Sequence, residues 1–464
     1  MKAVLPGLLL AMLLGALDQT VMAPALPAVA GDLGGLDQMP AVVTAYLVAA
    51  TVVMPVYGKL GDRYGRKPMM QAAILIFVAG AVLCALAGTM TQFVVFRAVQ
   101  GVGGGGLVIG AQAIIGELVS PRERGRYLGL IGAAYVVAAV GGPLLGGLAV
   151  DRLDWRWIFA GYPPLGLVAL ALLTVTLRLP APSREHGGAP IDYAGAFALA
   201  AAVVGVVLLG QTREPVFLLV AAAGAAAWLV SARRAADPIL PLRLFRDRAF
   251  AVPVAISLLI GFALFGTLTY LPAYLQIALR SSATQAGLPV TALMAGVLVT
   301  TVVSGRLITR TGRYKAYPVA GTALATAGLA LLGLTGGAGP AAVAGVLLLT
   351  GLGVGLVMQV MVTVAQNAVG RADLGAATSA VTFLRQVGAS AGVALAGALI
   401  TLRMAGDVPP SASPELSDAA RAAFAEAVPP VLGAMAPLMA VAFVLALALP
   451  ARPLRTTSHV EENA

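Results

Sequence analysis

The sequence predicts an all-α membrane protein of fourteen transmembrane helices, with two pseudo-symmetric bundles of six helices and two inserted central helices between them. Composition is the first observation, because 59% of the residues are hydrophobic, 11% are charged and the mean hydropathy is +0.92. A long series of apolar stretches is the second, and a basic motif that occurs twice is the third. A chain of this composition has lipid as its main surroundings.

The apolar stretches are long enough to cross a bilayer as helices. A spanning helix needs about 20 residues, whereas a barrel strand needs about ten and alternates polar with apolar side chains. Ala, Leu, Gly and Val fill these stretches without such alternation. We expect spans near residues 4–26, 40–59, 69–89, 92–115, 127–149, 158–177, 192–210, 215–232, 249–275, 286–308, 316–335, 342–366, 376–401 and 430–449.

The basic residues predict the orientation, because loops on the cytoplasmic side of a membrane collect Lys and Arg. With both termini in the cytoplasm, 22 of the 30 Lys and Arg residues lie in inner loops and 6 in outer loops, while Arg97 and Arg385 remain within spans. The net charge of +10 then reflects a multi-pass protein of the cytoplasmic membrane that contacts anionic inner-leaflet lipids. A nucleic-acid partner is not expected, because the sequence has no soluble basic module.

An internal duplication predicts how the spans are grouped. GKLGDRYGRK at residues 58–67 and GRLITRTGR at 305–313 share Gly, basic, Leu, Arg, Gly and Arg positions, displaced by 247 residues, but Asp62 of the first copy becomes Thr309 in the second. Six spans make a half of roughly 200 residues, about 50 short of this displacement, and two extra helices fill the difference. The expected domains are 1–180 and 236–464, joined by inserted helices at 181–235.

Few residues support a metal site, a dinucleotide site or a cleaved leader. Cys84 is the lone cysteine and lies in a span, and the two histidines lie in a polar loop and the tail, so no metal site is expected. Residues 101–106 match G-x-G-x-x-G without a preceding strand, which favours close helix packing. A signal peptide is the alternative for the first stretch, although Asp18 interrupts it and its loss leaves an odd number of spans.

Four further motifs accompany the one at 58–67. They are LDQTVMAPALP at 17–27, RAVQG at 97–101, GGPLLGG at 141–147 and DWRWIF at 154–159. In this order the five resemble the signatures of the major facilitator superfamily, and in particular of its drug:proton antiporters with fourteen spans. The resemblance covers nearly the whole chain and implies the major facilitator fold. Met22, Ala23 and Tyr162 depart from the Asn-containing motifs usual in the first and sixth helices, which leaves the substrate open.

Asp18 is the only carboxylate deep within a span of the N-terminal half, and it predicts a proton-coupling site. A charge at that depth costs roughly 2.5–3.5 kcal/mol on insertion scales, so it needs a partner. A rise of about 1.5 Å per residue places Asp18 at the depth of Arg97 on the fourth helix. We therefore expect Asp18 to face Arg97 and Gln100 and to titrate during transport. A permanent structural ion pair is the alternative.

The segment 58–67 is expected to form a loop that carries a conformational latch. Its residues are Gly58, Asp62, Arg63, Gly65, Arg66 and Lys67. An ordinary basic turn needs no carboxylate, so Asp62 predicts a pair with Arg66 and an approach to a helix N-terminus of the other half. The resemblance implies that this latch stabilises the outward-open state. Thr309 cannot supply the charge, so the second copy should be the weaker clasp.

The fifth span predicts a bend with a tight seam, because proline removes a backbone donor and small residues let a neighbour approach. The residues are Gly141, Gly142, Pro143, Gly146 and Gly147. The resemblance associates this antiporter motif with exchange transport and with sealing against leak. A plain packing kink is the alternative.

Six residues are candidates for the substrate cavity. They are Met22, Tyr46, Phe262, Phe265, Arg385 and Gln386. The aromatic side chains suit an amphipathic substrate, with simple packing as the alternative. Arg385 lies near mid-membrane in the thirteenth span, where the C-terminal half has no carboxylate, so contact with substrate and helix packing are both open.

Together these features predict a transporter that exports hydrophobic or amphipathic small molecules in exchange for protons by alternating access. The proton is the coupling ion, no other cofactor is expected, and the chain should act as a monomer. A metabolite uniporter or importer on the same fold is the alternative. An enzyme is not expected, because the buried residues include no metal cluster, no nucleophile with its base and no cofactor loop.

Overall fold

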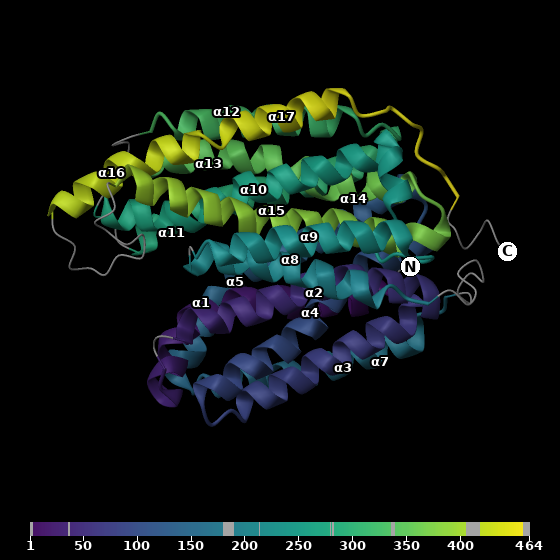
Figure 1. Ribbon diagram of the computed structural model, residues 1–464, viewed down its shortest axis with the longest axis horizontal. Helices are drawn as coiled ribbons and strands as arrows, with labels where there is room; N and C mark the ends of the chain where they lie inside the picture. The colour runs from purple at the N-terminus through teal and green to yellow at the C-terminus, as the bar shows by residue number, and fades with distance from the viewer. Residues whose placement is uncertain are drawn as a thin grey trace.

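The computed structural model describes residues 3–35, 38–179, 190–212, 214–278, 280, 283–335, 339–404 and 418–457. Long helices run side by side along the length of the molecule, as Figure 1 shows. The start of the first helix and residues 450–457 lie at the same end of this bundle (Figure 1). We call it the terminal end.

The helices fall into two groups with a pair between them. The first group contains α1 Leu5–Leu33, α2 Met39–Tyr64, α3 Arg66–Ala85, α4 Met90–Leu118, α5 Pro121–Arg152, α6 Arg156–Ala160 and α7 Tyr162–Thr176. The pair is α8 Tyr193–Thr212 and α9 Val216–Arg234. The second group contains α10 Arg248–Ile277, α11 Ala283–Thr311, α12 Ala316–Leu332, α13 Pro340–Gly355, α14 Met358–Asn367, α15 Leu374–Arg403, α16 Asp418–Gly433 and α17 Ala436–Leu447, with short 3-10 helices at Leu242–Arg246 (η3) and Arg371–Asp373 (η4).

Each expected span corresponds to helix. Among the described residues, thirteen helical segments are long and apolar enough to cross a membrane, and the remaining one, α12, has 17 residues because it ends at Gly333. The count of fourteen therefore stays a prediction. Three expected spans are divided, at Gly161, at residues 356–357 and at residues 434–435. At the first of these, Pro163 and Pro164 follow Tyr162 at the start of α7, and proline lacks the N–H that a continuous helix needs.

The expected loop at 58–67 is wrong in extent. Helix α2 continues to Tyr64 and α3 begins at Arg66, so Gly65 alone separates them, with φ of +97°. The second copy is similar, since α11 reaches Thr311 and Gly312 follows with φ of +69°. Glycine adopts this left-handed conformation readily, so one residue is enough for the turn. The motif side chains therefore project from the last turns of helices.

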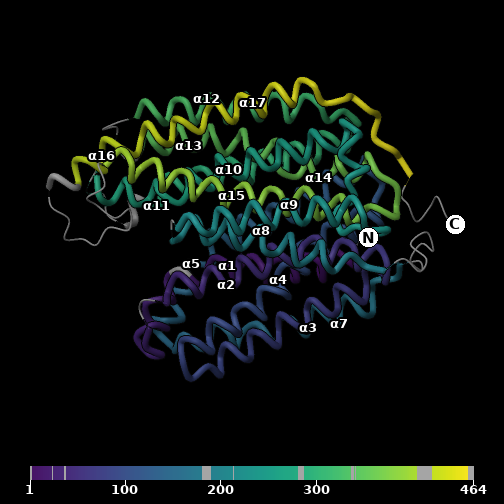
Figure 2. Tube along the Cα trace, viewed as in Figure 1, coloured from purple at the N-terminus to yellow at the C-terminus, as the bar shows by residue number. Residues whose placement is uncertain are grey.

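The two groups converge at the terminal end and spread apart toward the opposite end (Figures 1 and 2). Near the terminal end, α2 packs on α15 and α5 packs on α11. Toward the opposite end of α5, a Cβ on Gly141 or Gly147 would meet no atom within 4 Å, and Leu144 is 71% exposed. Helix α8 lies between the groups, because it packs on both α2 and α15.

Candidate functional site

A cavity of about 250 Å³ lies between the two groups. Helices α1, α2, α4 and α5 line one side, and α10, α11, α14 and α15 line the other. The apolar lining comprises Met12, Met54, Val108, Ile131, Val136, Ala139, Leu264, Phe265, Leu268, Met294, Val297 and Met358. The remainder comprises Gln19, Thr20, Gln112, Gly132, Tyr135, Thr301, Gln359, Thr382, Arg385 and Gln386. Apolar walls with a few convergent polar groups are typical of a ligand-binding site.

Three of the six candidates line this cavity, namely Phe265, Arg385 and Gln386. Met22, Tyr46 and Phe262 are not part of its lining, which corrects that prediction. The backbone of Phe262 packs against Gly392 on the seam between α10 and α15, so the cavity face of α10 begins at Leu264. Met22 is buried in the apolar core.

Asp18 and Arg97 form a buried ion pair within the first group. Arg97 Nη1 on α4 lies 2.7 and 2.8 Å from the two carboxylate oxygens of Asp18 on α1, and both side chains are nearly inaccessible. The same Nη1 donates to Gln100 Oε1 at 2.7 Å. The guanidinium also lies 4.4 Å from the ring centroid of Tyr46, a cation–π contact. The structure thus brings together the three residues of the expected proton-coupling site.

The glycines of α4 allow this cluster to form. A Cβ on Gly101 would overlap the backbone oxygen of Tyr46, and one on Gly104 would overlap its hydroxyl. A Cβ on Gly103 would overlap the backbone of Phe77 on α3. The pattern G-x-G-x-x-G therefore serves close packing of α4 against α2 and α3, as the sequence favoured.

Tyr46 connects the ion pair to the cavity. Its hydroxyl lies near the carboxylate of Asp18 and the side chain of Gln19, and it donates to the carbonyl of Gly15 at 3.5 Å. Gln19 lines the cavity. A series of polar groups therefore leads from the cavity through Gln19 and Tyr46 to the buried carboxylate.

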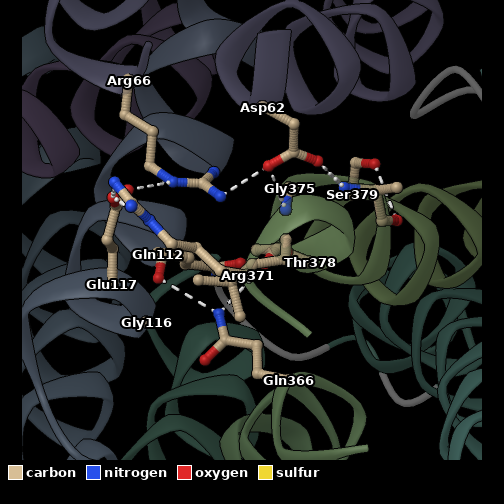
Figure 3. Close-up of polar contacts among 12 residues, drawn as sticks. Asp62, Arg66, Gln112, Gly116, Glu117, Gln366, Arg371, Gly375, Thr378 and Ser379 are labelled. Atoms are coloured by element: carbon tan, nitrogen blue, oxygen red, sulfur yellow. Dashed lines mark hydrogen bonds and ion pairs between the residues drawn. The ribbon is translucent and has the colours of Figure 1, made fainter. Parts of the chain in front are cut away.

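Asp62 joins α2 to the N-terminus of α15 (Figure 3). Its oxygens accept hydrogen bonds from the backbone amides of Gly375 at 2.9 Å and Ala376 at 3.0 Å, and Arg66 Nη2 lies 2.5 Å away. The N-terminus of a helix carries partial positive charge and favours an anion. Asp62 thus makes both expected contacts, with Arg66 and with a helix N-terminus of the other group.

Two charged residues that sequence reasoning missed extend this latch across the interface. Glu117 at the end of α4 accepts from Arg66 Nε at 2.7 Å and from Arg371 Nη2 at 2.7 Å (Figure 3). Arg371 belongs to η4 in the second group. Charges therefore alternate from Arg371 through Glu117 and Arg66 to Asp62. The signal in the sequence was a single acidic residue at the end of an apolar span, without a spacing that names its partners.

Amides near the latch add neutral contacts between the groups. Gln366 on α14 donates to the backbone oxygen of Gln112 at 3.2 Å and to the Thr378 hydroxyl at 2.8 Å. Thr382 on α15 donates to Gln112 Oε1 at 3.0 Å. Gln112 and Thr382 also line the cavity, so this layer lies between the cavity and the latch.

The other predicted latch residues have different surroundings. A Cβ on Gly58 would lie 2.6 Å from the carbonyl oxygen of Gly375, so this glycine permits contact between α2 and α15. Lys67 donates to the carbonyl of Thr174 in its own group, and the Arg63 guanidinium lies 5.6 Å from the ring centroid of Tyr64. Gly65 forms the turn described above.

Lys59 makes a contact that the sequence did not suggest. On α2, one residue after Gly58, it forms a buried ion pair with Asp237, in the segment between α9 and η3. The inserted helix pair is thereby tied to the first group at the terminal end. The motif segment therefore contacts the α9–η3 segment as well as α15.

The second copy of the motif also contacts the other group of helices, but there a cation meets the C-terminal end of a helix. Gly305 on α11 packs against Gly125 on α5, and a Cβ on either would overlap or crowd the other's backbone. Arg122 on α5 donates to the carbonyl of Thr309 at 3.1 Å and to that of Arg310 at 2.9 Å. Thr309 itself bonds back to its own helix. That this clasp is the weaker one stays a prediction.

The glycine-rich segment of α5 packs against α1 on one face only. A Cβ on Gly142 would overlap the Thr20 hydroxyl, and one on Gly146 would crowd the backbone of Val21. Gly141 and Gly147 face open space. Pro143 is exposed inside the continuous helix Pro121–Arg152. The tight seam thus involves two of the five predicted residues.

Residues after α17 connect both groups at the terminal end. Arg455 donates to the carbonyls of Asn367 and Val369, and its own carbonyl accepts from the Arg122 amide at 3.1 Å. Arg452 Nη1 lies 2.8 Å from Asp247 Oδ2. Slight burial raises the pKa of Asp247, but hydrogen bonds from Arg452 and the Ala249 amide outweigh it and lower the pKa below its ordinary value.

Comparisons with known proteins identify the family. A family model described as Major Facilitator Superfamily matches residues 8–393. An uncharacterised MFS-type transporter of Mycobacterium tuberculosis is 41% identical over 407 residues, and the alignment covers 85% of this chain but 58% of that protein. Multidrug resistance protein 3 of Bacillus subtilis is 31% identical over 411 residues, with 86% of this chain and 80% of that protein covered.

Solved structures share the fold. The human organic anion transporter MFSD10 (TETRAN) superposes with a TM-score of 0.68 at 17% identity, covering 96% of this chain and 99% of that one. The proton:xylose symporter XylE gives 0.68 at 16% identity, covering 100% and 98%. The family match and the identities to its relatives show that this chain belongs to the major facilitator superfamily of membrane transporters.

Proposed function

We propose that this chain exports hydrophobic or amphipathic small molecules across the cytoplasmic membrane in exchange for protons. The names of two Bacillus subtilis relatives, Multidrug resistance protein 3 and Multidrug transporter protein MdtP, support this substrate class at 31% and 30% identity. The apolar walls of the cavity suit such molecules. The observation that carries the proposal is the buried Asp18 carboxylate, which Tyr46 and Gln19 connect to the cavity.

Alternating access then consists of rocking between residues 1–180 and 236–464, with 181–235 joining them. The excess of basic residues assigns the terminal end to the cytoplasm. The contacts of Asp62 with the amides of Gly375 and Ala376 at that end support the assignment of an outward-facing state. Opening inward requires the amides of Gly375 and Ala376 to leave Asp62 and the Gly125–Gly305 contact to part.

Helix α2 connects the proton site to the latch. Tyr46 and Asp62 both lie on α2, and the rise of an α-helix places them about 24 Å apart along its axis. Protonation of Asp18 removes the anion that holds Arg97 and weakens their charge-assisted hydrogen bonds. Because Tyr46 packs on Arg97 and on the backbone of α4, a change in the pair alters how α2 rests on its neighbours. Proton binding thereby biases the latch.

The variant Asp18→Asn tests the coupling. In proteoliposomes, efflux of the neutral lipophile 1-naphthaleneacetamide driven by a proton gradient should fall at least about tenfold, as coupling energies of this kind allow. Binding of this amide to the purified variant should stay within about twofold. Asp32→Asn is the matched control, since Asp32 lies on the same helix in an exposed pair with Arg156 and should keep wild-type efflux. Full gradient-driven efflux by Asp18→Asn would remove Asp18 from the mechanism.

A uniporter or importer on the same fold is the alternative. A uniporter predicts equilibration of the substrate down its own gradient, with no dependence on the proton gradient. Reversing the gradient in the same vesicles separates the two, because an antiporter reverses its direction of transport and a uniporter does not.

A further inference from the structure

The described lining of the cavity contains one charged side chain, Arg385, and no carboxylate. Binding of cations is favoured by acidic groups, and this cavity offers a guanidinium instead. The charge of the cavity therefore bears on which substrates enter it.

Arg385 has no counter-ion in the described part of the protein. Its Nη1 is buried without a hydrogen-bond partner. Between residues 248 and 404 the sequence has a single acidic residue, Asp373, which lies at the terminal end of α15 and pairs with Arg243 at 2.7 Å. Across the cavity, Asp18 is already held by Arg97. A buried cation is costly unless it is paired, so an anion at this position would be stabilised.

The position of Arg385 is fixed by its helix. A Cβ on Gly261 of α10 would overlap the carbonyl oxygen of Arg385, and one on Gly388 would overlap that of Leu258. The backbone of α15 is therefore pressed against α10, while the Arg385 side chain belongs to the cavity lining. Tyr135 of α5 lines the opposite wall of the same cavity. A ligand between these walls would meet the guanidinium without rearrangement of the helix.

The neighbouring groups fit the two parts of an amphipathic anion. Thr382 and Gln386 flank Arg385 along α15 and supply further hydrogen-bonding groups. Phe265 and Leu268 of α10 offer an apolar surface to the rest of the molecule. A carboxylate matches the planar fork of a guanidinium, with two parallel hydrogen bonds, better than a neutral amide does.

We propose that Arg385 binds the carboxylate of a lipophilic organic anion and that such anions are preferred substrates of this cavity. The proposal rests on the function above, since it names the substrate class of the same exporter. A lipophilic cation of the same size would face the positive charge of Arg385 with no acidic residue in the described lining to offset it.

Three probes that share one ring system test this preference, namely tritiated 1-naphthaleneacetate, 1-naphthaleneacetamide and 2-(1-naphthyl)ethylamine. Binding to the purified full-length chain is measured at neutral pH by scintillation proximity. The wild type should bind the acid at least about tenfold more tightly than the amide, and the amine most weakly. Arg385→Gln should reduce acid binding at least about tenfold and leave amide binding within about twofold, and Arg385→Lys should fall between.

Arg403→Gln is the matched control, because Arg403 lies on the same helix but is exposed and outside the lining. It should leave all three affinities unchanged. Equal affinities of the wild type for acid and amide, or an equal loss of both in Arg385→Gln, would overturn the proposal. Gradient-driven export of 1-naphthaleneacetamide by a wild type that shows no acid preference would leave the exporter standing and refute this substrate class alone. Selective acid binding without any gradient-driven transport would support the site and refute the exporter.

Discussion

Each copy of the motif contacts the opposite group of helices through a close approach of two glycines. The charged side chain beside that contact is an anion in the first copy and a cation in the second. In the first copy, Gly58 of α2 meets Gly375 of α15, and in the second, Gly305 of α11 meets Gly125 of α5. The first clasp places the carboxylate of Asp62 at the N-terminus of α15. In the second, a guanidinium from α5 approaches carbonyls at the C-terminal end of α11.

This difference shows that the two interfaces share the glycine contact but not the charged residue beside it. Helices that cross closely need small residues at the crossing, so the glycine contact persists in both copies. The charge has only to match the helix end that it meets, an anion at an N-terminus and a cation at a C-terminus, and either helix can carry it. Asp62 is 5% exposed, whereas Arg122 is only half-buried, so the first clasp should contribute more.

Asp62→Asn should have the largest effect on the separation of the two groups of helices at the terminal end. It removes the anion from the N-terminus of α15 and leaves Arg66 paired with Glu117 alone, and breaking a buried charged pair costs up to about 3–5 kcal/mol. The terminal end should open in most molecules. Spin labels at Tyr64→Cys and Arg313→Cys, both at exposed positions on opposite groups, report this by pulsed electron resonance.

The control for Asp62→Asn is Glu123→Gln, an exposed carboxylate on the first turn of α5. It should leave the distance between the labels unchanged. An unchanged distribution in Asp62→Asn would show that the glycine contacts alone hold the clasp.

Gly58→Ala and Gly305→Ala should increase the separation of the two groups by similar, intermediate amounts. Each added methyl would overlap backbone of the opposite group, and overpacking of this kind costs about 1–3 kcal/mol. Both variants should move the labels apart by similar amounts. Gly141→Ala, where a Cβ meets no atom within 4 Å, is the control. Unequal effects of the two variants would mean that the shared backbone contact differs in importance between the copies.

Arg122→Gln should have the smallest effect on the separation of the two groups at the terminal end. Its hydrogen bonds to the Thr309 and Arg310 carbonyls are partly exposed, and such bonds contribute about 0.5–1.5 kcal/mol each. The label distance should shift slightly, and transport should be reduced only a few-fold on that scale. Arg126→Gln, on the exposed face of α5 one turn later, serves as the control. A loss as large as that of Asp62→Asn would refute the ranking of the two clasps.

The fold and part of the site followed from local properties of the sequence. Depth along two helices was enough to pair Asp18 with Arg97, because helical rise is constant and a buried charge needs a partner. Glu117 and Arg371 were missed because each is isolated in its own segment, and only the meeting of α4 with η4 relates them. Tyr46 and Phe262 were placed in the cavity wrongly because a span that is apolar on every side gives little indication of which face turns inward.

The amino-acid sequence alone was enough to predict the membrane class, the approximate positions of the spans, the duplication and the shared depth of Asp18 and Arg97. These depend on transfer free energies and on spacing along one chain, which need no knowledge of neighbours. The folded structure was needed to show that the second clasp uses Arg122 in place of a carboxylate and that the ring of Tyr46 packs on the guanidinium of Arg97. Those contacts depend on how each helix is rotated about its axis and on which helix it meets, and packing between the two groups sets both.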